Sequence, residues 1–237
     1  MALLGLLLMA TLSFATLFDE ANGQYKTGNF TEAAATYEKI LNAEGPRASV
    51  FYNLGNSYQA QKQYGFAILA YERARLLTPR DPDLLANLNL ARKAATAFEE
   101  PVSYPTLEVV IQYLSRDEWS WLVAGSALLF GALAVFCGWR GTHKVALISA
   151  ATASLVIAAG TAILWARRGE SGRGIILSEN ATVRLSPFEK AESLGTPGQG
   201  KSVRMGAKSG DFQYAEVLST NLRGWLAGKD VAAIVPE

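Results

Sequence analysis

The sequence predicts a chain in three parts: an α-helical repeat, a pair of membrane-spanning helices and a small β domain. Three observations support this prediction. Residues 16–100 match themselves at a shift of 34 residues, and residues 119–166 contain two uncharged apolar runs. In residues 174–237 the pattern changes to short β-like segments broken by Gly, Pro and Asn.

Composition excludes several classes of function. The 22 basic and 21 acidic residues nearly cancel, so no net field attracts nucleic acid. The single cysteine, Cys137, lies inside an apolar run, and the single histidine, His143, lies between the two runs. Neither soluble portion can therefore hold a Cys–His or Ser–His catalytic pair or a zinc cluster. We expect no catalytic residue, no bound metal and no cofactor.

The N-terminal residues 1–15 form an apolar segment that ends in Ser13-Phe14-Ala15, a small-residue pattern typical of a cleavage site. A cleaved signal peptide and an uncleaved N-terminal anchor are both consistent with it, and both would export the residues that follow. The remaining alternative is a buried first helix.

Residues 16–100 carry the repeat. The second unit, residues 48–81, is the clearer, because Gly55 and Ala67 are small where two helices would cross and Pro79 would end the second helix. Its signature positions are Phe51, Leu54, Gly55, Tyr58, Tyr64, Ala67, Tyr71, Ala74 and Pro79. They resemble the tetratricopeptide repeat (TPR) pattern. The resemblance implies two helix–turn–helix units, followed by a capping helix over residues 82–97 with Leu85, Leu88 and Ala91 on its buried face.

The TPR resemblance also implies a concave groove lined by the first helix of each unit. The residues expected there are Asn22, Tyr25, Lys26, Tyr52, Asn56, Gln59 and Asn87. Asn and Gln amides both donate and accept hydrogen bonds, which suits the backbone of an extended peptide. A carboxylate clamp is not expected, since Phe18 and Asp83 stand where it needs Lys. Alternatively, these polar residues simply form a solvated face.

Residues 101–118 read as a linker and an amphipathic segment. Residues 119–139 and 145–166 are each long enough to span about 30 Å as a helix, so they predict a two-helix transmembrane hairpin. Small residues such as Gly131, Ala150 and Ser154 form a stripe where the helices could meet. A buried helical hairpin of a soluble protein is the alternative.

Residues 174–237 contain Ala181-Thr-Val-Arg-Leu-Ser-Pro187, Leu194-Gly-Thr196, Asp211-Phe212, Glu216-Val217 and Gly224-Trp225-Leu226. In this order they resemble the bacterial SH3 (SH3b) domain, which implies a small SH3-like β-barrel. Such domains often bind cell-wall peptides, so Phe212, Tyr214 and Trp225 are candidate ligand-binding residues. The alternative is that Trp225 and Phe212 belong to the core of the barrel.

The order of leader, TPR units, hairpin and SH3b domain resembles the BatE-type proteins of bacterial aerotolerance operons. The resemblance implies a stress-tolerance protein of the bacterial inner membrane, working with von Willebrand A-domain and TPR membrane proteins. With an exported N-terminus, both soluble domains face the periplasm, although the distribution of Lys and Arg does not favour this orientation. We expect a non-catalytic membrane-anchored scaffold; the alternative is a peptidoglycan-binding or sensing protein that acts through its SH3b domain.

Overall fold

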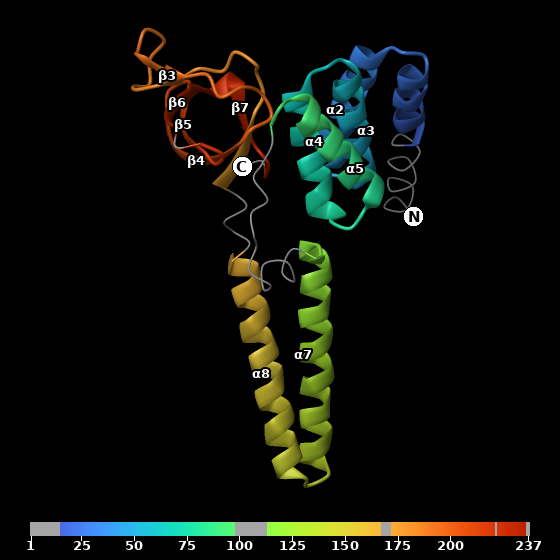
Figure 1. The fold of residues 1–237 in the computed structure, drawn as a ribbon. Helices are drawn as coiled ribbons and strands as arrows, with labels where there is room; N and C mark the ends of the chain where they lie inside the picture. Colours follow the sequence, from blue (N-terminus) through green and yellow to red (C-terminus); the bar gives the residue numbers. More distant parts are fainter. Residues whose placement is uncertain (1–14, 98–112, 167–171, 221, 236–237) are drawn as a thin grey trace. The chain divides into compact units, whose positions relative to one another are not determined.

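The structure is a computed structural model that describes residues 15–97, 113–166, 172–220 and 222–235 (Figure 1). The predicted leader, apart from residue 15, and most of the predicted linker lie outside these residues. The chain divides into two compact units. One contains the helical residues 15–97, here called the repeat domain, and residues 172–235, here called the β domain. The other contains two long apolar helices, here called the hairpin.

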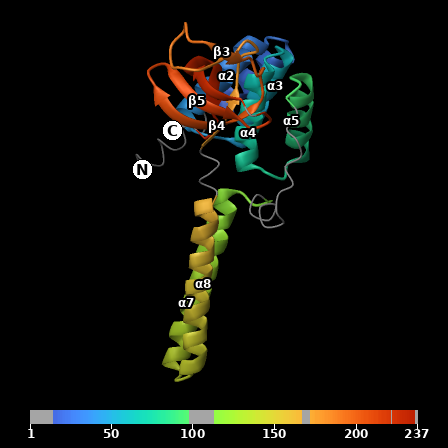
Figure 2. The ribbon, with the colours of Figure 1, turned by 60° about the vertical axis from the view of Figure 1, so that its left-hand side comes forward.

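The repeat domain is a stack of antiparallel helices (Figures 1 and 2). A helix over residues 15–26 is followed by α2 (Phe30–Glu44), α3 (Ala48–Ala60), α4 (Tyr64–Leu77) and α5 (Pro82–Ala94). The same turn ends three of these helices, at Gly28, Lys62 and Thr96, which have φ values of 83°, 60° and 52°. These residues are spaced 34 apart, so the repeat in the sequence is also a repeat of backbone conformation.

Local chemistry sets the start of α5. The Asp81 side chain accepts hydrogen bonds from the backbone N–H groups of Asp83 and Leu84. Pro82 occupies the first turn, where a backbone N–H would have no partner within the helix, so its missing N–H costs no hydrogen bond. The buried face of α5 contains Leu84, Leu88 and Ala91. The prediction of Leu85 on this face was wrong by one residue, because the helix starts in a register that turns Leu84 inward and leaves Leu85 half-buried.

The hairpin consists of α7 (Arg116–Trp139) and α8 (His143–Ala166), which lie side by side (Figure 1). Ser115 and Glu118 form a capping box at the start of α7. Both helices are long and apolar enough to cross a membrane. The predicted stripe of small residues is not the contact, since Ala150 and Ser154 are exposed. Gly160 is buried instead, and a Cβ added there would collide with the side chain of Val123 on α7.

The β domain is one antiparallel sheet of seven strands, in the order β3-β2-β6-β5-β4-β1-β7. The strands are β1 (Arg173–Ile176), β2 (Val183–Arg184), β3 (Ser193–Gly195), β4 (Ser202–Ser209), β5 (Phe212–Val217), β6 (Arg223–Ala227) and β7 (Val231–Ala233). Sequence patterns did not indicate β3, which is largely exposed, or β7, which has three residues after a short 3₁₀ turn. Val203, Val217 and Leu226 are central members of its core.

The repeat domain and the β domain share a hydrophobic core. Ile175, Leu177 and Ile234 of the β domain belong to the same buried cluster as Ile68 and Leu84 of the repeat domain. The shared core forms although the hairpin separates the two domains in sequence.

Candidate functional site

The candidate groove is built from two copies of one hydrogen-bonded triad. In the first copy, Asn22 Oδ1 accepts a hydrogen bond from the Tyr37 hydroxyl at 2.6 Å and another from Asn53 Nδ2 at 3.1 Å. Asn22 lies on the first helix, Tyr37 on α2 and Asn53 on α3. One amide oxygen therefore ties three consecutive helices together.

The second copy lies 34 residues further along the chain. Asn56 Oδ1 accepts from the Tyr71 hydroxyl at 2.7 Å and from Asn87 Nδ2 at 3.0 Å. Tyr52 and Gln59 extend this copy, because Asn87 Nδ2 also donates to the Tyr52 hydroxyl and Tyr71 also donates to Gln59 Oε1. The structure thus brings four of the predicted groove residues into one network.

Burial fixes the direction of these bonds. Desolvation raises the pKa of Tyr37 to about 12, and burial also raises the pKa of Tyr71. Both phenols are therefore neutral donors at physiological pH. Because their hydroxyl protons occupy the amide oxygens of Asn22 and Asn56, these two side chains keep only their amide N–H groups for a ligand. Within the described residues, neither Asn22 Nδ2 nor Asn56 Nδ2 donates a hydrogen bond.

The other two predicted groove residues stand outside the triads. Tyr25 is half-buried, and its ring contacts that of Phe30 edge-on with the ring centroids 5.2 Å apart. Lys26 is exposed. Sequence reasoning did not assign Tyr37, Tyr71 or Asn53 to the site. The signal that could have found them is the 34-residue shift, which pairs Asn22 with Asn56, Tyr37 with Tyr71 and Asn53 with Asn87.

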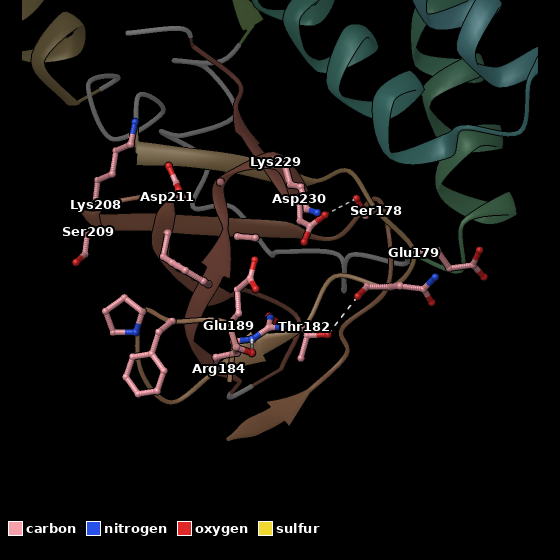
Figure 3. Close-up of a pocket in the computed structure, with 17 residues that line it drawn as sticks. Ser178, Glu179, Thr182, Arg184, Glu189, Lys208, Ser209, Asp211, Lys229 and Asp230 are labelled. Atoms are coloured by element: carbon pink, nitrogen blue, oxygen red, sulfur yellow. Dashed lines mark hydrogen bonds between the residues drawn. The ribbon is translucent and has the colours of Figure 1, made fainter. Parts of the chain in front are cut away.

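The β domain holds an open cavity of about 1470 Å³ (Figure 3). Its wall is formed by residues from three segments, which lie within positions 178–189, 208–212 and 227–230. Charges of both signs line it, including Lys208, Asp211 and Lys229. Arg184 stiffens one side, since its Nε donates to Glu189 O and its Nη1 to Thr182 O, each at 3.1 Å.

The three predicted aromatic residues do not form one groove. Phe212 lines the cavity, whereas Tyr214 and Trp225 do not. Tyr214 and Trp225 are cross-strand partners on β5 and β6, and their rings meet edge-on at 5.4 Å. Phe212 and Trp225 are half-buried and lie outside the core, where Leu226 is fully buried instead. The alternative that they belong to the core is therefore wrong, because the alternation of side chains along each strand turns them to the opposite face.

No group of three or more His, Cys, Asp or Glu side chains in the described part of the chain is arranged to hold a metal ion.

Residues 48–81 match the tetratricopeptide repeat family. These are the residues of the predicted second unit, so the prediction of a tetratricopeptide repeat there is confirmed. No curated protein matches the chain.

Proposed function

We propose that the protein is a non-catalytic, membrane-anchored adaptor that binds an extended segment of a partner protein in the groove of its repeat domain. Tetratricopeptide repeats generally mediate protein–protein interactions, and residues 48–81 are one. The observation that carries the proposal is the pair of equivalent triads, in which the oxygens of Asn22 and Asn56 are occupied and their N–H groups stay available.

The triads favour a partner segment that offers backbone carbonyls. Asn22 and Asn56 present amide donors at equivalent places in consecutive units, and a peptide carbonyl accepts from such donors without regard to its side chain. The next equivalent position is Leu90, which is 55% exposed on α5. A matching segment therefore makes polar backbone contacts at two units and places an apolar side chain against Leu90 in the third.

The hairpin supplies the anchor. Large apolar side chains cover its outside, with Leu128 and Val135 each 75% exposed and Leu147 71% exposed. Contiguous apolar surface of this extent is costly in water and favourable in hydrocarbon. Trp121 and Trp139 lie towards opposite ends of α7. Indole rings favour the lipid headgroup region, so this spacing suits a helix that spans a bilayer.

A substitution that keeps the triad and removes the donor tests the groove. Asn56→Asp retains the oxygen that Tyr71 and Asn87 use, but replaces the free amide by an acceptor. We expect crosslinking of the partner from a photoreactive group at Lys26, in intact membranes, to fall about tenfold, the cost of roughly one hydrogen bond.

The matched control is Asn29→Asp, which makes the same change of charge at an exposed residue outside both triads. It should leave crosslinking unchanged, and both variants should unfold like the wild type. Unchanged crosslinking in Asn56→Asp would contradict the proposed groove.

The proposal also places the protein in the bacterial envelope. The β domain is taken as SH3-like, on its motif order and its short strands, and the whole chain as a BatE-type protein. On this view both soluble domains lie in the periplasm, and von Willebrand A-domain and TPR membrane proteins are the partners in a stress-tolerance complex. A protease added to spheroplasts should then digest the repeat domain; protection until lysis would exclude this orientation.

The cavity of the β domain favours a second candidate, a wall-binding protein. Its mixed charges and the adjacent Phe212 suit a ligand with both charged and apolar groups, such as a cell-wall peptide. In a pull-down with purified wall sacculi, this candidate predicts that retention is lost in Lys229→Glu and in Phe212→Ala, both in the cavity wall, but kept in Asn56→Asp. Failure of the wild type to bind sacculi would remove it.

A further inference from the structure

One face of α4 carries the β domain. The Gly65 N–H donates to Gln199 Oε1 at 3.1 Å. Arg73 reaches the last strand, where its Nε donates to Ile234 O at 3.2 Å and its Nη2 to Ala233 O at 2.9 Å. Each of these bonds joins residues more than 130 positions apart in the sequence.

The contact is too close to be a loose association. A Cβ added at Gly65 would collide with Leu177 O and lie 2.7 Å from Ile176 O, so β-domain backbone lies directly against the helix. On the other side, Gly200 has a φ of 81°, and its Cβ would lie 2.6 Å from Ile68 Cδ1. Both positions require glycine, one for space and the other for conformation as well.

The first unit of the repeat domain shows that this face is specialised. At the 34-residue shift, Gly65, Leu69 and Arg73 correspond to three residues that are all exposed. These are Thr31, Ala35 and Lys39. The second unit therefore changes positions that the first unit leaves to solvent, and the changes fit the β domain.

The buried carboxylate of Glu72 gives the same indication. Its counterpart, Glu38, is exposed and accepts a hydrogen bond from Tyr58. Glu72 is fully buried and paired with Arg75 at 2.8 Å and with Arg92, which occupies the position equivalent to Tyr58. Arg173, at the start of β1, adds a third positive charge to its surroundings. Cations thus surround this carboxylate where Glu38 has Leu41 and Tyr58 at the equivalent positions, and one of these cations comes from the β domain.

The repeat pattern of the sequence also ends after α5. Asn87 and Thr96 reproduce the first helix and the turn of a third unit. In the sequence, however, Pro101 and Pro105 stand where the second unit has Ala67 and Tyr71. Proline in a helix interior removes a hydrogen bond and clashes with the preceding turn, so the pattern of a third unit is not continued.

We propose that the β domain closes the repeat stack where the third unit breaks off, so that the repeat domain and the β domain are one folding unit into which the hairpin is inserted. The inference does not depend on what the groove binds. It requires the two soluble parts to stay together when the covalent connection through the hairpin is removed.

Cutting the full chain on both sides of the hairpin tests this. Specific protease sites are inserted after residues 103 and 169 of the detergent-solubilised protein, which is cleaved and run on a sizing column. The two soluble fragments should co-elute in equal amounts, separate from the hairpin. Separate elution of the wild-type fragments would overturn the inference.

Two pairs of variants locate the contact. Gly65→Leu should weaken the association of the fragments at least 100-fold, whereas Thr31→Leu, at the equivalent position, should not change it. Leucine favours helix more than glycine does, so the loss cannot come from α4 itself. Arg73→Ala should weaken the association about tenfold, and Lys39→Ala should have no effect. Equal effects within either pair would overturn the assigned face, and the Arg73 pair introduces no bulk that could prevent folding.

Discussion

Gly55→Leu should unfold the second repeat unit. A Cβ at this position would lie 2.5 Å from Cε1 and 2.6 Å from Cδ1 of the Tyr71 ring. The ring cannot move aside cheaply, because its hydroxyl is held by Asn56 and Gln59 and the residue is fully buried. Overpacking alone costs about 1–3 kcal/mol. Loss of the buried hydrogen bonds adds a comparable amount, which removes much of the stability of a small domain.

Urea unfolding followed by far-ultraviolet circular dichroism measures this effect. Gly23→Leu is the control, because a Cβ at this other helical glycine would meet nothing within 4 Å. Its free energy of unfolding should equal that of the wild type or exceed it by up to about 1 kcal/mol, since leucine favours the helix more than glycine does. Unchanged unfolding of Gly55→Leu would mean that α3 and α4 cross elsewhere.

Glu72→Gln should cost about 3–5 kcal/mol, the range observed when one partner of a buried ion pair is removed. The neutral amide leaves Arg75 and Arg92 without the carboxylate that both contact in the wild type. Glu38→Gln is the matched control at the equivalent, exposed position, and it should cost less than about 1 kcal/mol. Similar losses in the two variants would contradict the assigned role of burial.

The same carboxylate predicts a dependence on pH. Burial by itself raises the pKa of Glu72, but the charges of Arg75, Arg92 and Arg173 outweigh it, and the pKa is lowered overall. A carboxyl whose pKa is lower in the folded state stabilises the fold above its unfolded pKa, near pH 4, and loses this contribution as pH falls through the folded value. Unfolding free energy measured from pH 6 to pH 2 should therefore fall less in Glu72→Gln than in the wild type.

Much of the helical part could be predicted from the sequence because its signals are local and repeated. The 34-residue shift indicated the repeat. Gly55 and Ala67, which are small, indicated where two helices cross, and Gly28 indicated a turn between helices. The register of α5 was less certain, since Leu84 and Leu85 are both apolar and only the helix start at Asp81 decides between them. Similarly, many small residues in α8 could form its contact, and packing against Val123 selects Gly160.

The candidate site was predicted only in part. Residue types on the first helix of each unit indicated the groove, but not that Tyr37 and Tyr71 saturate the amide oxygens. In the β domain, Trp225 could not be placed on either face of its strand, because only the partner strand determines which side is buried. The contact of Arg73 with β7 had no sequence signal at all, since it depends on a meeting of distant segments.

The antiparallel course of α7 and α8 has a consequence for how the protein is made. The ribosome completes the repeat domain before it adds Ile175, Leu177 and Ile234, so the face of α4 that these residues help to cover is at first exposed. In the proposed membrane-anchored protein, the reversal of direction between α7 and α8 would return the β strands to the side of the membrane that holds the repeat domain, and this shortens the search for their contact. The contact between α4 and the β domain can therefore be completed only after Ile234, near the end of the chain, has been synthesised.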